Sequence, residues 1–233
     1  MKSSDNQNPF ALSVGDLMAA LLLLFVLILM GVLLQLQEQV ENQNVIVEKF
    51  DNLNEQLYQD LRDEFKDDLP RWHATLIDTT LSIRFEEPKM LFDDGQWKLK
   101  DTFKLILNDF FPRYLNVIQR PEYYSEISEI RIEGHTSSKG FGTKNDNYLF
   151  NIGLSQKRAK STLAYLFNSI NLQEKDKDWC ISKLTANGLS WSKLIYSDNG
   201  EEDENLSRRV EFRVKIDAER KLRELSKMLK GVK

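Results

Sequence analysis

The feature that most constrains this chain is an apolar run near its start, from Phe10 to Leu34. The 25 residues of the run carry one formal charge, Asp16, and Leu17–Leu34 carries none. A run of about 18 or more apolar residues is long enough for a transmembrane helix. At ~1.5 Å per residue it spans roughly 37 Å, more than the ~30 Å hydrocarbon core of a bilayer. We therefore predict a transmembrane helix over residues 10–34.

A cleaved signal peptide is the alternative interpretation of this run. The run is longer than the ~7–15 apolar residues of a signal peptide, and no small-residue cleavage site follows it. Residues 1–9 form a short tail with Lys2, and the next basic residue after the run is Lys49, which three glutamates precede. Positive-inside counting favours a cytoplasmic tail and an exported C-terminal body.

Asp16 needs an explanation of its own. A charge at a helix centre costs about 2.5–3.5 kcal/mol on insertion scales, and Asp16 lies about 9 Å inside the run. One interpretation is a carboxyl group that reaches the headgroups or stays protonated. The other is a group that takes up and releases an ion at a protein–protein interface, with Gly15 permitting close helix approach. The span has no second ionisable group, so another chain must complete any ion path.

Residues 35–70 have the pattern of a long polar helix. Apolar residues recur at threes and fours from Leu36 to Leu69, and no Gly or Pro intervenes before Pro70. The segment has ten acids and three bases, and its apolar stripe is narrow, as in a helix pair. We predict a helical linker that joins two copies in a parallel homodimer. A solvated connector is the alternative.

Residues 71–216 have the pattern of a compact α+β domain. Alternating apolar residues predict strands and longer periodicities predict helices, in the order strand 77–85, helix 98–117, strand 129–133, helix 154–170, strand 184–189 and strand 210–216. The order βαβαββ fits helices packed on one face of a mixed sheet. A basic helix is expected over residues 217–233.

The sequence has no pattern of a metal centre or a catalytic site. Cys180 is the single cysteine, which excludes an intramolecular disulfide, and two distant histidines add no metal-ligand spacing. No nucleophile with its base and no phosphate-binding loop is present. We expect no cofactor, no resident metal and no enzymatic activity. The net charge of −4 and the exported body argue against direct nucleic-acid binding.

Four motifs in order give the domain a specific character: IRIEGHTSSKG, NIGLSQKRAKSTLAYLF, LTANGLS and LSRRVEFRVKI. Together they resemble the OmpA-like peptidoglycan-binding domain over roughly Leu76–Ile216. That family surface binds the diaminopimelate-containing peptide of the cell wall. The resemblance implies binding residues at Thr136, Ser137, Phe150, Asn151, Leu154, Arg158, Arg208 and Arg209.

The helical members of this set share a face, because Asn151, Leu154 and Arg158 are spaced by three and four. The resemblance implies that the guanidinium of Arg158 binds the peptide carboxylate, for which its planar fork is suited. Arg208 and Arg209 match a pair of family arginines, of which one supports the site. Solvation of the sheet edge is the alternative role for each.

The chain departs from the family pattern at several positions. Ser137 stands where the family has an aspartate for the diaminopimelate amine, and Ser207 stands where it has an asparagine before the arginine pair. The loop over residues 138–150 is longer than typical, and Asp146 within it is a candidate substitute for the missing carboxylate. These departures predict weak or conditional wall binding, or binding through other contacts.

The span SVGDLMAALLLLFVLILM is similar to that of the MotB class of stator subunits, whose aspartate carries the ion. By this resemblance Asp16 is a proton or sodium site. Flagellar members have a longer, basic cytoplasmic tail than residues 1–9. In its short tail, the sequence of its span and its overall size, the chain is similar to the MotB-like subunit of the Zorya anti-phage defence system.

The resemblance implies an ion-driven rotary motor of the bacterial inner membrane that works in defence. Two copies would stand inside a ring of a MotA-like partner (ZorA in a Zorya system), of five subunits, with the exported domains in the periplasm on peptidoglycan. The partner would relay rotation to cytoplasmic effectors. Residues 35–44 are a candidate plug that blocks ion flow before wall binding.

Three alternatives remain open from the sequence. A flagellar stator subunit has the same design. An energy transducer of the ExbD or TolR type shares the single span with one aspartate, but its periplasmic domain lacks the Asn-Leu-Ser-Arg-Ala pattern. A purely structural wall tether, in which Asp16 plays no part, is the third.

Overall fold

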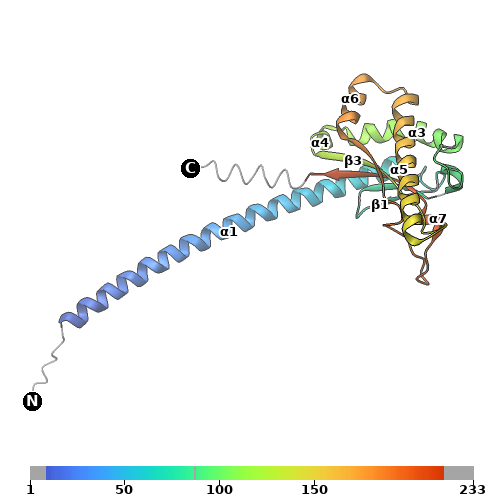
Figure 1. Cartoon of the computed structure of the whole chain (residues 1–233). Helices are drawn as coiled ribbons and strands as arrows, with labels where there is room; N and C mark the ends of the chain where they lie inside the picture. Colours follow the sequence, from blue (N-terminus) through green and yellow to red (C-terminus); the bar gives the residue numbers. More distant parts are fainter. Residues whose placement is uncertain (1–8, 87, 218–233) are drawn as a thin grey trace, which may run out of the picture. The chain divides into compact units, whose positions relative to one another are not determined.

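The computed structural model describes residues 9–86 and 88–217 of the chain (Figure 1). The tail predicted over residues 1–9, apart from Pro9, lies outside the described residues, as does the basic helix predicted over 217–233, apart from Asp217. The chain divides into two compact units. The first includes the N-terminal helix as far as Lys49, and the second begins at Phe50.

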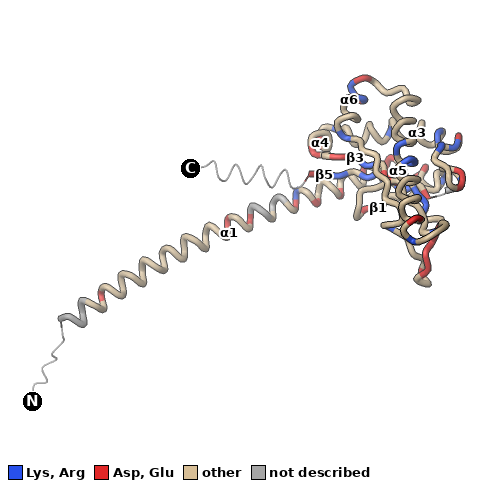
Figure 2. The backbone as a smooth tube through the Cα atoms, in the orientation of Figure 1, with Lys and Arg blue, Asp and Glu red and all other residues tan. Residues whose placement is uncertain are grey.

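The helix α1 runs from Pro9 to Phe65 and begins as an apolar helix. Its residues 14–41 are long and apolar enough to cross a membrane, and their side chains are exposed. Among the described residues it is the one helix with these properties. Figure 2 shows how sparse charged residues are along this part of α1. This part of α1 therefore has the length and composition of the transmembrane helix predicted over residues 10–34.

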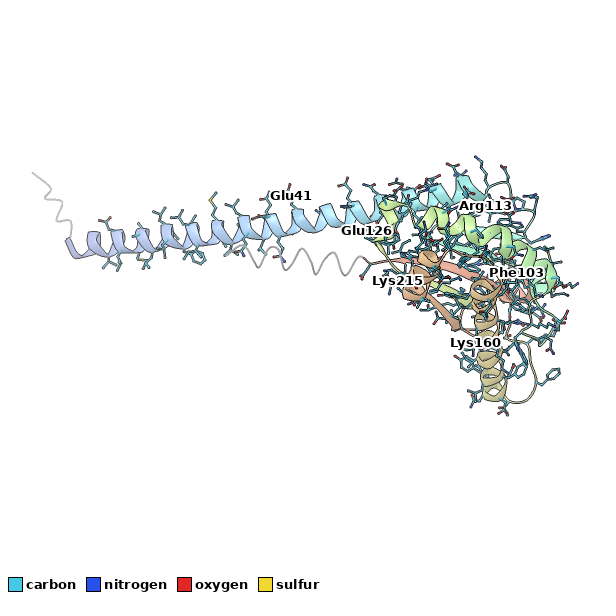
Figure 3. The ribbon with its side chains drawn as sticks, turned by 90° about the horizontal axis from the view of Figure 1, so that it is seen from above. Glu41, Phe103, Arg113, Glu126, Lys160 and Lys215 are labelled. Carbon is cyan, nitrogen blue, oxygen red and sulfur yellow. The ribbon has the colours of Figure 1, made fainter. Side chains whose placement is uncertain are left out.

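The last turns of α1, from Phe50 onward, belong to the second unit. Three hydrophobic residues spaced by four are fully buried in the core of this unit: Leu57, Leu61 and Phe65. Arg113 holds this end of the helix, because its Nε donates to Glu64 Oε1 at 2.7 Å and its Nη2 to the Glu64 carbonyl at 2.8 Å (Figure 3). The end of the helix predicted over residues 35–70 thus contributes to the domain core.

The second unit contains a mixed five-stranded sheet with the strand order β1-β2-β5-β3-β4. The strands are β1 (Ala74–Ile77), β2 (Ser82–Phe85), β3 (Ile127–Gly134), β4 (Leu184–Gly188) and β5 (Val210–Ile216). The strands β3 and β4 pair in parallel, and the other neighbours are antiparallel. The predicted α+β fold class is confirmed.

The prediction of one strand over residues 77–85 is wrong, because the chain forms a hairpin there. The strand β1 ends at Ile77, and β2 begins at Ser82 after a turn. The Leu81 N–H donates to the Asp78 carbonyl at 3.1 Å, and Leu81 has a φ of 45°. Apolar residues alternate straight through this turn in the sequence, so periodicity alone did not reveal it.

Six helices follow α1 in the described chain: α2 (Pro88–Leu91), α3 (Asp101–Ile118), α4 (Pro121–Tyr124), α5 (Lys144–Ser169), α6 (Glu174–Lys183) and α7 (Glu204–Ser207). The helix predicted at 154–170 begins ten residues earlier, so the predicted loop over 138–150 is too long. The cause is a capping box, in which Thr143 Oγ1 accepts from the Asp146 N–H and the Asp146 carboxylate accepts from the Thr143 N–H. The helix α6 was not among the predicted elements.

The two faces of the sheet have opposite character. On one face, Phe85 of β2 and Phe212 of β5 pack their rings against Phe110 of α3, with centroids 5.3 and 5.1 Å from it. On the other face, register places charged residues side by side on three neighbouring strands: Arg84 on β2, Glu211 on β5 and Glu133 on β3. The helices pack on the apolar face, and the charged face ends at the loop that follows β3.

Candidate functional site

The segment after β3 buries three short polar residues. His135, Thr136 and Ser137 are at most 4% exposed. The His135 N–H donates to the Arg209 carbonyl at 3.0 Å, and the Thr136 N–H donates to the Ser190 carbonyl at 2.9 Å. Within the described chain, the hydroxyl of Thr136 has no hydrogen-bond partner. Such a buried polar atom calls for a ligand or water.

Two glycines bring α5 against the ends of the parallel strands. A Cβ on Gly134 would lie 2.4 Å from the Ser155 carbonyl oxygen, and one on Gly188 would lie 2.3 Å from the Gln156 nitrogen. Only glycine allows this approach. The Ser155 hydroxyl also accepts from the Ser190 N–H at 3.0 Å. The motif helix is thereby held beside the loop after β3.

The predicted helix face exists on α5. Asn151, Leu154 and Arg158 are all buried, with 4, 8 and 6% exposure. Asn151 Nδ2 donates to Asn147 Oδ1 at 2.8 Å, and Asn147 Nδ2 donates to the Ser138 carbonyl at 2.8 Å. This chain of amides ties the helix face to the loop after β3.

The guanidinium of Arg158 contacts the turn that begins at Asp93, a contact that was not predicted from the sequence. Its Nε donates to the Gln96 carbonyl at 2.9 Å and its Nη2 to the Asp93 carbonyl at 3.4 Å. Its carbon Cζ lies 4.9 Å from the centroid of the Phe92 ring. Burial, and next the positive charge of Arg208, lower the pKa of Arg158 to about 10, so it remains charged at neutral pH.

The two adjacent arginines have different surroundings. Arg208 lies near enough to Arg158 to oppose its charge, and its Nη1 is 3.7 Å from Asp94 Oδ1. Its Nε is buried and unpartnered among the residues that the structure describes. Arg209 is 4% exposed and donates through Nε to Glu211 Oε1 at 2.6 Å. Arg208 thus joins Arg158 at the site, and Arg209 belongs to the charged face of the sheet.

A second cluster on the charged face joins Glu133, His135 and Glu211. One ligand atom from each lies within 4.8 Å of the others, and all three residues are buried. Glu211 Oε1 already accepts from Arg84 Nε at 3.0 Å and from Arg209 Nε. Burial, the largest single effect, raises the pKa of Glu211, but Arg209, His135 and Arg84 together outweigh it, so the pKa of Glu211 is lowered. Two guanidiniums therefore occupy the place where a metal ion would bind Glu211, and the donor set does not fit a resident metal.

A carboxylate that hydrogen-bonds to the loop after β3 belongs to Glu202, which the sequence did not single out. Asp146 caps α5, where its carboxylate accepts from the Thr143 hydroxyl at 2.7 Å. Glu202 instead accepts from the Ser138 N–H at 2.9 Å and from the Ser138 hydroxyl. Glu202 follows Ser138 by more than 60 residues in the sequence, so no local sequence pattern predicts their contact.

Two of the predicted residues take no part in these contacts. Phe150 is 60% exposed, next to buried Asn151 but on the open side of α5. Asp16 is on the apolar part of α1, where it is exposed and is the one charged residue between Val14 and Gln37. The two compact units therefore carry two separate candidate sites, a carboxylate on the apolar helix and a basic site on the domain.

Two known proteins match this chain over most of their length. The chain is 38% identical over 227 residues to Zorya protein ZorB of Escherichia coli strain Crooks, which covers 97% of this chain and 95% of the relative. It is 24% identical over 226 residues to Zorya protein ZorB of Escherichia coli O139:H28, with 92 and 83% coverage. No family model matches the chain.

Among solved structures, the chain is similar to a MotB-like protein from Desulfovibrio vulgaris. The TM-score is 0.50 at 20% identity, with 73% of this chain and 95% of that one covered. At this identity the likeness concerns the fold, and it agrees with the α+β class predicted from the sequence.

Proposed function

The chain belongs to the ZorB family of Zorya proteins, and on this premise we propose that it is the wall-anchored, ion-carrying subunit of an inner-membrane motor in anti-phage defence. The observation that carries the proposal is the presence, among the residues that the structure describes, of one apolar helix with a lone carboxylate and a separate domain with a basic site. The helix crosses the membrane once, and the domain is periplasmic.

The basic site of the domain binds the carboxylate of the wall peptide. Arg158 and Arg208 place two guanidiniums near one another, and an anion between them relieves their mutual repulsion. The Thr136 hydroxyl and Arg208 Nε are buried and have no hydrogen-bond partner among the described residues, so both are polar atoms that the ligand would satisfy. Glu202, beside Ser138, supplies the negative charge that Ser137 lacks for an amine.

The membrane carboxylate carries the ion. Two copies stand inside a ring of the MotA-like partner ZorA, of five subunits, and the two Asp16 carboxyl groups alternately load at the ring. Loading neutralises Asp16 and lowers the cost of an apolar environment, and release to the cytoplasm restores its charge. One ion crossing 100 mV supplies about 2.3 kcal/mol, enough for a small rotational step. A proton is the expected ion.

The wall-bound domains hold the dimer still, so torque appears in the partner ring. Phage-induced disturbance of the envelope allows the domain to engage the wall, and residues 35–44 cease to block the ion path. The partner's cytoplasmic part relays rotation to the effectors. No enzymatic step is assigned to this chain.

The test is phage plating on cells that carry the native operon with Asp16→Asn. Protection is expected to be lost at unchanged membrane levels of the protein, measured by blot. Asp51→Asn is the matched control, because it removes one exposed carboxylate from the same helix outside the apolar run and the candidate plug. Equal protection by wild type and Asp16→Asn would overturn the ion-carrying role and leave a wall tether.

A further inference from the structure

An exposed apolar stripe lies on α1 just past the predicted transmembrane helix. Leu36, Val40 and Val47, called the linker stripe below, are 52, 54 and 54% exposed. Their spacing of four and seven keeps them on one helix face, which Phe50 continues into the core of the second unit. A groove of about 450 Å³ on α1 is lined by Leu36, Gln37, Val40, Glu41 and Asn44. An apolar stripe of this kind is typical of a helix that packs against a partner helix.

The charge of the linker makes a second copy of it a poor partner for this stripe. Residues 35–70 hold ten acids and three bases, a net charge of −7. Two such helices side by side repel one another, and a partner of opposite charge is favoured instead. The linker stripe therefore fits a basic amphipathic helix.

The chain contains such a sequence at its own C-terminus. Residues 218–233, called the C-terminal segment below, hold six bases and two acids, a net charge of +4. Their apolar residues are spaced by three, four and three, at Leu222, Leu225, Leu229 and Val232. This is the spacing of a seam in a two-helix coiled coil, and it matches the spacing of the linker stripe.

The described chain ends beside α1, within reach of the stripe. The end of β5, Val214 to Ile216, lines a groove of about 520 Å³ together with Phe50 and Asn54 of α1, inside the second unit. From Phe50 back to Leu36 the helix α1 rises about 21 Å, and a helix over residues 218–233 spans about 24 Å. The C-terminal segment is thus long enough to cover the whole stripe. Its covalent attachment near Phe50 gives it a high effective concentration there.

We propose that the C-terminal segment of each chain binds the linker stripe of the same chain as an antiparallel helix. The apolar seam of the segment covers the stripe, and its bases offset the acids of the linker. The net charge of the pair is −7 plus +4, or −3, which lowers the repulsion between neighbouring copies. The inference depends on neither the ion-carrying nor the wall-binding role.

The test is thiol cross-linking in membranes of cells that carry the native operon. Val40→Cys combined with Leu229→Cys should be joined by a short bismaleimide within one chain, seen as a monomer on a denaturing gel and as a linked peptide by mass spectrometry. Glu38→Cys with Leu229→Cys is the matched control, because Glu38 lies on the opposite face of α1, and should link about 10-fold less. The native Cys180 does not interfere, since it is buried and burial raises its thiol pKa to about 12.

A second set of variants tests the apolar seam. Leu222→Asn with Leu225→Asn should abolish the link between positions 40 and 229, whereas Glu224→Gln, which is off the seam, should keep it. Links that join two chains would overturn the inference and assign the stripe to a second copy. A yield no higher than that of the Glu38 control would also overturn it, and would leave the C-terminal segment to the membrane surface or another protein.

Discussion

Arg158 on α5 donates through Nε to the backbone carbonyl of Gln96 at 2.9 Å, across 62 residues of sequence. The contact joins the motif helix to the turn that begins at Asp93, whose carbonyl accepts from the same guanidinium. Gly95 in this turn has a φ of 67°, a conformation that favours glycine. The residue expected to bind the wall peptide is thus also a structural link within the domain.

Replacing Arg158 is expected to affect both binding and stability. Arg158→Ala removes the carboxylate-binding guanidinium and should abolish sedimentation of the protein with purified cell-wall sacculi. The loss of two hydrogen bonds to backbone carbonyls should lower the free energy of unfolding by about 1–2 kcal/mol, measured by urea denaturation. Lys160→Ala, on the exposed side of the same helix, is the control and should change neither (Figure 3). Full sedimentation of Arg158→Ala would contradict the peptide site.

The two adjacent arginines should respond in opposite ways. Arg209→Ala leaves Arg84 as the one guanidinium that donates to the buried carboxylate of Glu211 among the described residues, and should cost about 3 kcal/mol of unfolding free energy. Arg208→Ala should leave stability within about 0.5 kcal/mol, because Arg208 is partly exposed, yet weaken sacculus binding. Urea denaturation and sedimentation of both variants check this. Equal stability losses would show that the assignment of separate roles is wrong.

The domain should lose stability in mildly acidic solution through His135. Burial is the main cause that lowers the pKa of His135 below its ordinary value of 6.5, and the charge of Arg209 lowers it further. Glu133 and Glu211 act in the opposite direction without reversing the shift. The unfolded chain therefore binds a proton at a pH where the folded chain does not. The unfolding free energy should fall as pH decreases below about 6.5, by at most about 1.4 kcal/mol per pH unit.

Urea denaturation between pH 7.5 and 5.5 measures this slope. His135→Gln should flatten it in that range, whereas His73→Gln, which changes an exposed histidine, should retain it. A slope that is the same in wild type and His135→Gln would assign the acid sensitivity to other groups.

The close approach of α5 to β3 should make Gly134 intolerant of a methyl group. Gly134→Ala places Cβ 2.4 Å from the Ser155 carbonyl oxygen, so the helix must move, at a cost of about 1–3 kcal/mol. Gly153→Ala is the matched change, because Gly153 is within α5 and has nothing within 4 Å of its added Cβ. It should stabilise the fold by about 0.5–1 kcal/mol. Thermal or urea unfolding of both variants gives the comparison.

Features carried by local periodicity were predicted from the sequence. The apolar helix with Asp16 follows from the length and composition of one segment. The shared helix face of Asn151, Leu154 and Arg158 follows from their spacing of three and four, whereas their burial is a finding of the structure. The α+β class and most strands follow from alternation. Turns that leave alternation intact were not resolved, which is why one strand was predicted where β1 and β2 form a hairpin.

The tertiary structure decided which distant residues meet. Pairing of β3, β5 and β2 placed Glu133, Glu211 and Arg84 side by side and gave Arg209 a structural partner. Folding likewise brought Glu202 to Ser138 and the Asp93 turn to Arg158. Periodicity reports the environment of a residue relative to its own helix or strand. Contacts across 60 or more residues depend on how the elements pack, because that packing is set by the whole core rather than by any one segment.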